Sequence, residues 1–119
     1  MRHWEMMAKA LFLIMSGKES PERANIGIMS AARSAEAKRY EDLKVIFFGP
    51  SEEYIANLSG QPLEFLRKLQ AMNLVDSACV GVAERYGMKD KLVSLGFQLA
   101  PAGERIAYYV NKGYEVISF

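Results

Sequence analysis

The 119-residue sequence predicts an α/β fold, specifically a three-layer α/β/α sandwich built on a five-stranded parallel sheet. Short, dense apolar runs alternate along the chain with longer segments whose apolar residues recur at helical spacing. Half of the residues are hydrophobic, so a buried core can form. No shift in composition marks a second domain, and we therefore expect residues 1–119 to form a single domain.

Five apolar segments are expected to be strands, namely residues 10–15, 45–48, 75–79, 97–99 and 114–119. The first runs without a polar residue from Ala10 to Met15 and is followed by Ser16-Gly17. The second is followed by Gly49-Pro50. Continuous apolar runs that stop at such turn residues are typical of strands buried on both faces.

Five further segments are expected to be helices, namely residues 21–38, 51–57, 62–72, 88–95 and 101–111. The first follows Ser20-Pro21-Glu22, which combines an N-cap serine, a proline at the first helical position and an acid in the first turn. Gly96 and Gly113 follow the last two helices, as glycines do at helix ends.

The alternation of strands and helices implies right-handed βαβ units and a parallel sheet covered on both faces. Ligands of such sheets bind at the carboxyl ends of the strands. We therefore expect any small ligand to contact residues at this edge: Ser16, Gly17, Gly49, Pro50, Ser51, Val80 and Gly81.

Charge and residue counts exclude several classes of function. Fifteen basic residues balance fourteen acidic ones, which argues against nucleic-acid binding through phosphate contacts. No apolar run approaches the ~20 residues needed to cross a bilayer, and no secretory signal is evident. One cysteine and one histidine, His3, cannot complete a closed zinc site or an internal disulfide. We expect no metal and no cofactor, and a cytoplasmic protein.

The sequence lacks the residues required by two common phosphate-binding motifs. Gly17-Lys18 resembles the end of a P-loop, but Phe12 stands where its first glycine belongs and Glu19 where Ser or Thr belongs. No G-x-G-x-x-G follows either of the first two expected strands, so a dinucleotide site has no motif support.

The single cysteine, Cys79, ends the third expected strand and lies at the edge where ligands bind. The residues after it can begin a short helix that ends at Gly87. A thiol at the start of a helix faces free backbone N–H groups, which favour the nucleophilic thiolate. Alternatively, Cys79 is a buried and inert residue, as free cysteines often are.

A series of short motifs resembles the DsrE/DsrF-like family of small sulfur-relay proteins and covers nearly the whole chain. The motifs are Phe12-Leu-Ile-Met-Ser16, Val45-Ile-Phe-Phe-Gly-Pro50, Ala78-Cys79, Ala83, Gly87-Met88, Lys91-Leu92, Ala100-Pro-Ala-Gly103 and Lys112-Gly-Tyr-Glu-Val-Ile-Ser-Phe119. The resemblance implies a flavodoxin-like, DsrE-like sandwich assembled as a homo-oligomer, a trimer or a hexamer. It also implies that Cys79 accepts sulfane sulfur as a persulfide from a donor protein and hands it to an acceptor protein.

Two functions other than sulfur relay are compatible with these residues. The chain could be a structural or regulatory oligomer subunit in which Cys79 is inert. It could also be a cysteine-dependent phosphatase, because Cys79 and Arg85 have the C-x5-R spacing of those enzymes. Glu84, however, would repel a phosphate inside such a loop. The absence of a second cysteine excludes dithiol redox chemistry.

Five other residues carry expectations. Glu52 and Glu53 are expected either to lie on a solvated helix face or to be first-turn acids that favour the helix dipole. One of Tyr108 and Tyr109 is expected to face the sheet and the other to be exposed as an interface candidate. Trp4, near the start of the chain, could dock on a neighbouring subunit or on its own domain.

Overall fold

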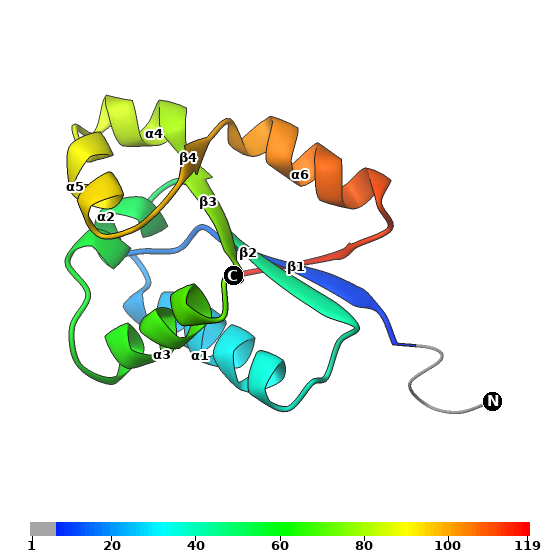
Figure 1. Ribbon diagram of the computed structural model, residues 1–119. Helices are drawn as coiled ribbons and strands as arrows, with labels where there is room; N and C mark the ends of the chain where they lie inside the picture. Colours follow the sequence, from blue (N-terminus) through cyan, green and yellow to red (C-terminus); the bar gives the residue numbers. More distant parts are fainter. Residues whose placement is uncertain (1–6) are drawn as a thin grey trace.

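The protein is an α/β sandwich on a five-stranded sheet in which every neighbouring pair of strands is parallel, as predicted. This computed structural model describes residues 7–119 (Figure 1). The strand order is β4-β3-β2-β1-β5, which differs from the flavodoxin order 2-1-3-4-5. The strands are β1 Lys9–Ile14, β2 Asp42–Phe47, β3 Val75–Cys79, β4 Leu99–Ala100 and β5 Glu115–Ser118.

The helices form layers on the two faces of the sheet and a cluster at one end. Helices α1 and α3 cover one face, α6 covers the other, and α2, α4 and α5 gather beyond the carboxyl ends of the strands (Figure 1). The helices are α1 Pro21–Glu36, α2 Ser51–Ala56, α3 Gly60–Ala71, α4 Val80–Arg85, α5 Lys89–Ser94 and α6 Ala102–Asn111.

Most predicted boundaries agree with the structure to within two residues, and β3 agrees fully. The largest difference is at β2, which begins at Asp42 rather than at residue 45. The additional residues alternate polar and apolar because they lie at the amino end of the strand, where only Leu43 enters the core. Strand β4 is only two residues long and begins at Leu99 rather than at residue 97.

The larger part of the core lies between the sheet and helices α1 and α3. Phe12 and Phe47 from the central strands pack with Ile28 of α1 and with Leu66 and Leu69 of α3, and all five side chains are almost fully buried. Burial of each such side chain contributes roughly 1.5–3 kcal/mol to folding. This face therefore supplies most of the hydrophobic stabilisation.

The opposite face of the sheet has a smaller core. Leu11 and Leu13 of β1 and Ile46 of β2 pack with Tyr109 of α6. Tyr109 is buried while its neighbour Tyr108 is 43% exposed, which confirms that one tyrosine of the pair faces the sheet. Helix α6 alone covers this face, so the attachment of α6 to the sheet depends on polar contacts as well as on apolar burial.

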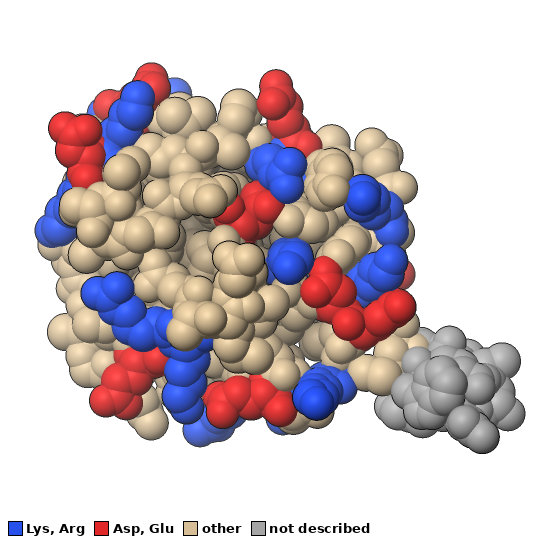
Figure 2. Space-filling view, viewed as in Figure 1, with Lys and Arg blue, Asp and Glu red and all other residues tan. Residues whose placement is uncertain are grey.

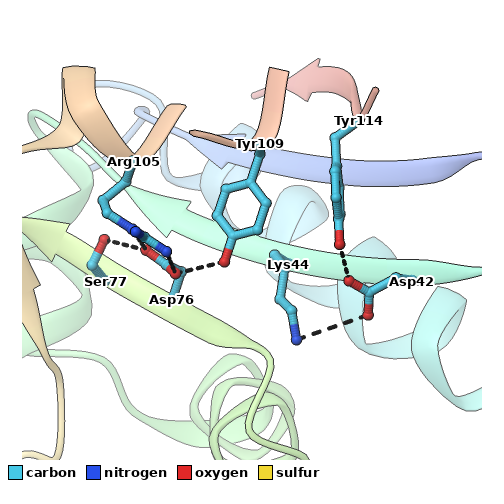
Figure 3. Close-up of polar contacts among 7 residues, drawn as sticks. All are labelled: Asp42, Lys44, Asp76, Ser77, Arg105, Tyr109 and Tyr114. Carbon is cyan, nitrogen blue, oxygen red and sulfur yellow. Dashed lines mark hydrogen bonds and ion pairs between the residues drawn. The ribbon is translucent and has the colours of Figure 1, made fainter. Parts of the chain in front are cut away.

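Asp76 on β3 is the centre of those polar contacts (Figure 3). Its carboxylate accepts hydrogen bonds from Arg105 Nε at 3.0 Å, Arg105 Nη2 at 2.9 Å, Tyr109 Oη at 2.6 Å and Ser77 Oγ at 2.9 Å. Burial opposes ionisation of Asp76, but the hydrogen bonds from Arg105, Tyr109 and Ser77 outweigh it and hold the pKa below its ordinary value. The carboxylate thus fixes helix α6 to strand β3.

A register shift between β2 and β3 places Asp76 in this position. Val45 pairs with Val75 and Ile46 with Ser77, so Asp76 is an extra residue without a partner on β2. Such bulges redirect a side chain from its normal alternation. A second polar contact lies nearby, where the Tyr114 hydroxyl donates to Asp42, whose carboxylate also lies 3.8 Å from Lys44 Nζ (Figure 3).

The surface carries charges of both signs in close mixture on the face shown in Figure 2. This distribution agrees with the net charge of +1. Within residues 7–119, no helix is both long and apolar enough to cross a membrane.

We expect Asp76→Ala to lower the free energy of unfolding by about 3 kcal/mol at neutral pH, because it leaves Arg105 and Tyr109 beneath α6 without their acceptor. Since its folded pKa lies below the unfolded value of about 3.9, Asp76 stabilises the fold above that pH, and this contribution is lost as the pH falls through the folded pKa. Urea unfolding at several pH values measures both effects. Glu104→Ala, an exposed change on α6, is the control and should stay within about 0.5 kcal/mol of wild type; an equal loss in both variants would contradict the assigned role.

Candidate functional site

The loops that follow β1 and β2 touch at the carboxyl edge of the sheet. A Cβ atom on Gly17 would lie 2.2 Å from the carbonyl oxygen of Pro50, so only glycine allows this approach. The Ser51 N–H donates to the Met15 carbonyl at 2.9 Å, and the Ser51 hydroxyl donates to the Ile14 carbonyl at 2.7 Å. These contacts fix the beginning of helix α2 against the end of strand β1.

Gly49 forms the turn between β2 and α2. Its φ angle is +90°, a backbone conformation that residues other than glycine rarely adopt. Its N–H donates to Oε2 of Glu52 at 3.1 Å, and the Glu52 N–H donates back to the Gly49 carbonyl at 3.0 Å. This reciprocal contact resembles a capping box, in which an acid reaches back three residues to the helix start.

Glu52 is the unusual residue of this edge. Glu52 lies in the first turn of α2, as one of the two expectations had it, but the other, a solvated side chain, is wrong because the side chain has no exposed surface. Its Oε1 atom has no hydrogen-bond partner among the described residues. Burial raises the pKa of the Glu52 carboxyl to about 7, despite the opposing effect of the Gly49 and Cys79 backbone N–H groups. Glu53, by contrast, is partly exposed and lies 3.5 Å from Lys18.

Cys79 stands next to this carboxyl group, at the junction of β3 and α4. It is the N-cap residue of α4, so the predicted short helix after the cysteine exists. The Cys79 backbone N–H faces the Glu52 carboxylate. The residue as a whole is 8% exposed. Ala78 belongs to the core beneath α1 and α3, so by strand alternation Cys79 lies on the α6 side.

The residues predicted to bind a ligand all lie at this edge, but most of their polar groups already have internal partners. The Ser16 N–H donates to the Phe119 carbonyl and the Gly17 N–H to Glu19 Oε1. The donors of Gly49 and Ser51 are engaged as described above. Pro50 and Gly81 are exposed and Val80 is half-buried. A Cβ on Gly81 would meet no atom within 4 Å, so the edge is open there.

The phosphatase arrangement receives no geometric support. Residues Val80–Arg85 form a helix, not a loop that could wrap a phosphate with its N–H groups. Arg85 is exposed in the last turn of that helix. Among residues 7–119 there is also no group of three or more His, Cys, Asp or Glu side chains placed to hold a metal ion. His3 and Trp4 lie outside the described residues.

Glu52 was missed as a site residue although the sequence carried one signal for it. The spacing Gly49-Pro50-Ser51-Glu52 is that of an acid reaching back to the start of its own helix. The burial of Glu52 could not be read from this spacing, because it depends on α4 and α5 packing against α2 from a later part of the chain.

Comparison with known proteins establishes the fold but no family. No protein-family model matches the sequence, and no curated protein resembles it. The chain is similar in structure to a conserved protein of unknown function, BT1422, from Bacteroides thetaiotaomicron. The TM-score is 0.75 at 20% sequence identity, with 93% of this chain and 94% of the other covered. At this identity the similarity shows a shared α/β fold alone.

We expect Glu52 to make the protein less stable as the pH rises. Its folded pKa is raised from 4.5 to about 7, so the folded state holds the proton more tightly and stability is lost between about pH 4.5 and 7. The loss should be about 3 kcal/mol and should be absent in Glu52→Gln. Urea unfolding from pH 4.5 to 8 measures it. The matched control is Glu53→Gln on the same turn, which should keep the wild-type pH dependence; an unchanged slope in Glu52→Gln would refute the assignment.

Proposed function

We propose that this protein is a sulfur carrier in which Cys79 accepts a sulfane sulfur atom from a donor protein and passes it to an acceptor protein. The observation that supports this proposal best is the position of Cys79, the single cysteine of the chain, at the end of β3 beside a buried carboxyl group. The carboxyl edge of a parallel sheet is where such folds carry out their chemistry. The motif resemblance to sulfur-relay proteins supports the same reading.

The chemistry requires only one thiol and a partner. The Cys79 thiolate attacks the terminal sulfur of a donor persulfide, a bond forms between Sγ and that sulfur, and the donor S–S bond breaks. The donor leaves as a thiolate that takes up a proton, so no external oxidant or reductant is needed. The second transfer repeats the exchange with the acceptor thiol. Because the chain has no second cysteine, the persulfide cannot be resolved internally.

We propose that partners reach Cys79 through the open space at Gly81, two residues further along the chain. A partner cysteine could approach over the first turn of α4, where no atom would obstruct a Cβ on Gly81. We propose further that the chain acts in the cytoplasm as a homotrimer or homohexamer, with the exposed ring of Tyr108 available to an interface.

A second function is favoured by one observation. Only 8% of Cys79 is exposed, which suits a structural or regulatory oligomer subunit with an inert cysteine. Native thiol labelling separates the two functions. An inert Cys79 reacts slowly in the folded protein and rapidly once the chain is unfolded, whereas a sulfur carrier reacts measurably in the native state.

We expect incubation with a persulfide donor to add one sulfur atom to the wild-type chain, because Cys79 can form a persulfide. Intact-mass spectrometry under native incubation measures this addition. Cys79→Ser is the control and should gain nothing. No addition to wild type, or an equal addition to both proteins, would eliminate the sulfur-carrier proposal.

We expect Gly81→Phe to slow sulfur transfer from a donor protein severalfold while leaving the fold intact, because the ring would occupy the open approach to Cys79. Gly81→Ala should be as stable as wild type or slightly more so, since alanine favours the helix, and should transfer sulfur at the wild-type rate. Mass spectrometry of the persulfide in samples quenched at successive times gives both rates. Equal rates in Gly81→Phe and Gly81→Ala would show that partners approach from elsewhere.

A further inference from the structure

We propose that the outer surface of helices α1 and α3 carries a binding groove for an amphipathic molecule with a single anionic head, such as a fatty acid. No described residue that lines the groove belongs to the candidate site at the carboxyl edge, so the inference is independent of the proposed sulfur-carrier function. Three features support it: the shape of this surface, the order of apolar and basic side chains along it, and two arginines that pair with no acid among the described residues.

Two adjoining hollows make up the groove. Helices α1 and α3 pack side by side on one face of the sheet (Figure 1). A hollow of about 360 Å³ lies toward the start of α1 and one of about 610 Å³ toward its end, and both are lined by Gln61 and Phe65 of α3. Because they share these residues, the hollows form one continuous groove. Each has the size of a small-molecule site, which typically measures about 300–1,000 Å³.

The two ends of the groove differ in chemistry. The smaller hollow is lined by Ile26 and Met29 of α1 and by Pro62 of α3, and Ile26 is 44% exposed. The larger hollow contains basic side chains, of which Arg33 lies on the same face of α1 as Ile26 and Met29, since the three recur at spacings of three and four. A rise of ~1.5 Å per residue places Arg33 roughly 10 Å beyond Ile26 along the helix. An apolar stretch that leads to a cationic end matches a molecule with one acyl chain and one anionic head.

Three cations line the basic end of the groove, namely Arg33, Arg39 and Lys68. Arg33 Cζ and Lys68 Nζ lie 5.5 Å and 5.7 Å from the centroid of the Phe65 ring. Lys68 is paired with Glu36 at 3.5 Å, but neither arginine forms an ion pair with any residue in the range 7–119. Two guanidinium groups are therefore available to hold a carboxylate through charge-assisted hydrogen bonds.

Acidic residues along the groove favour a ligand with one anionic head over a polyanion. Glu22 lines the apolar hollow, and Glu36 and Glu64 line the basic one. An acidic peptide that lay along the groove would bring several carboxylates close to these glutamates, and like charges repel one another. A single carboxylate needs contact with Arg33 and Arg39 alone, while its acyl chain extends into the apolar hollow.

The test titrates decanoate, below its critical micelle concentration, into the wild-type protein and follows the backbone amides by NMR. We expect saturable binding with the largest shifts at Ile26 and Phe65. Replacing both arginines, by Arg33→Gln and Arg39→Gln, should weaken decanoate binding about tenfold or more and leave the affinity for decanol, the neutral analogue, unchanged. Arg23→Gln is the matched control, because Arg23 is an exposed charge on the same helix outside the groove, and this variant should bind decanoate like the wild type.

Several results would overturn the proposal. These are no saturable shift with decanoate, shifts centred on another surface, or an equal loss of affinity in the Arg23→Gln control. Binding of poly-L-glutamate in place of decanoate at the same residues would assign the groove to an acidic peptide instead. A wild-type dimer in sedimentation velocity that Ile26→Asp dissociates, together with no binding of decanoate, would assign it to a second copy of the chain.

The apolar end of the groove has its own variant. Ile26→Asp places a charge in the apolar hollow and should weaken the binding of both decanoate and decanol, because Ile26 lines that hollow. Unchanged affinity for both molecules would contradict the assigned path of the acyl chain. Cys79→Ser should bind decanoate like the wild type, so the groove and the sulfur-carrier proposal are judged separately.

Discussion

The contact between Gly17 and Pro50 is the constraint on which the carboxyl edge depends. Because Gly17 has no side chain, the loops after β1 and β2 approach to within direct backbone contact. Ser51 can then donate both its N–H and its hydroxyl to the end of β1. These bonds hold the start of α2, and the start of α2 places Glu52 between the ends of β2 and β3. Two loops whose contacting residues, Gly17 and Pro50, stand 33 positions apart in the sequence are thereby joined at one edge.

The two faces of the sheet are stabilised by different interactions. Beneath α1 and α3 the contacts are apolar, and the core is continuous from Phe12 to Leu69. Beneath α6 the apolar contacts are few, and Asp76 links the helix to the sheet through Arg105 and Tyr109. The bulge in β3 makes this possible because it turns Asp76 out of the normal alternation. Placing a carboxylate beneath a helix is favourable when several donors hydrogen-bond to it. Without those donors, removing the same charged group from water would cost free energy.

The protein therefore contains one partly buried acid, Asp76, and one fully buried acid, Glu52, with opposite properties. Asp76 has four hydrogen bonds from three residues, and its pKa is held below the ordinary value. Glu52 has one unpartnered oxygen, and burial raises its pKa to about 7. The first acid is ionised throughout the physiological range and fastens a helix. The second can change its charge within that range, and its carboxylate faces the backbone N–H of Cys79, the single cysteine of the chain. The contrast shows how the surroundings of two carboxyl groups in one fold move their pKa values in opposite directions.

Local sequence patterns were sufficient to predict the parallel five-stranded sheet, the helices between its strands and the position of Cys79 at a strand end. Apolar runs, turn glycines and helix-start signals act over a few residues, so they can be read without the fold. The short β4 and the polar start of β2 were less visible, because their pairing depends on neighbouring strands. The strand order, the bulge at Asp76 and the burial of Glu52 were decided by tertiary structure alone. Each arises where segments distant in sequence meet. The raised pKa of Glu52 follows because those segments exclude water and, among residues 7–119, bring no cation to its carboxyl group.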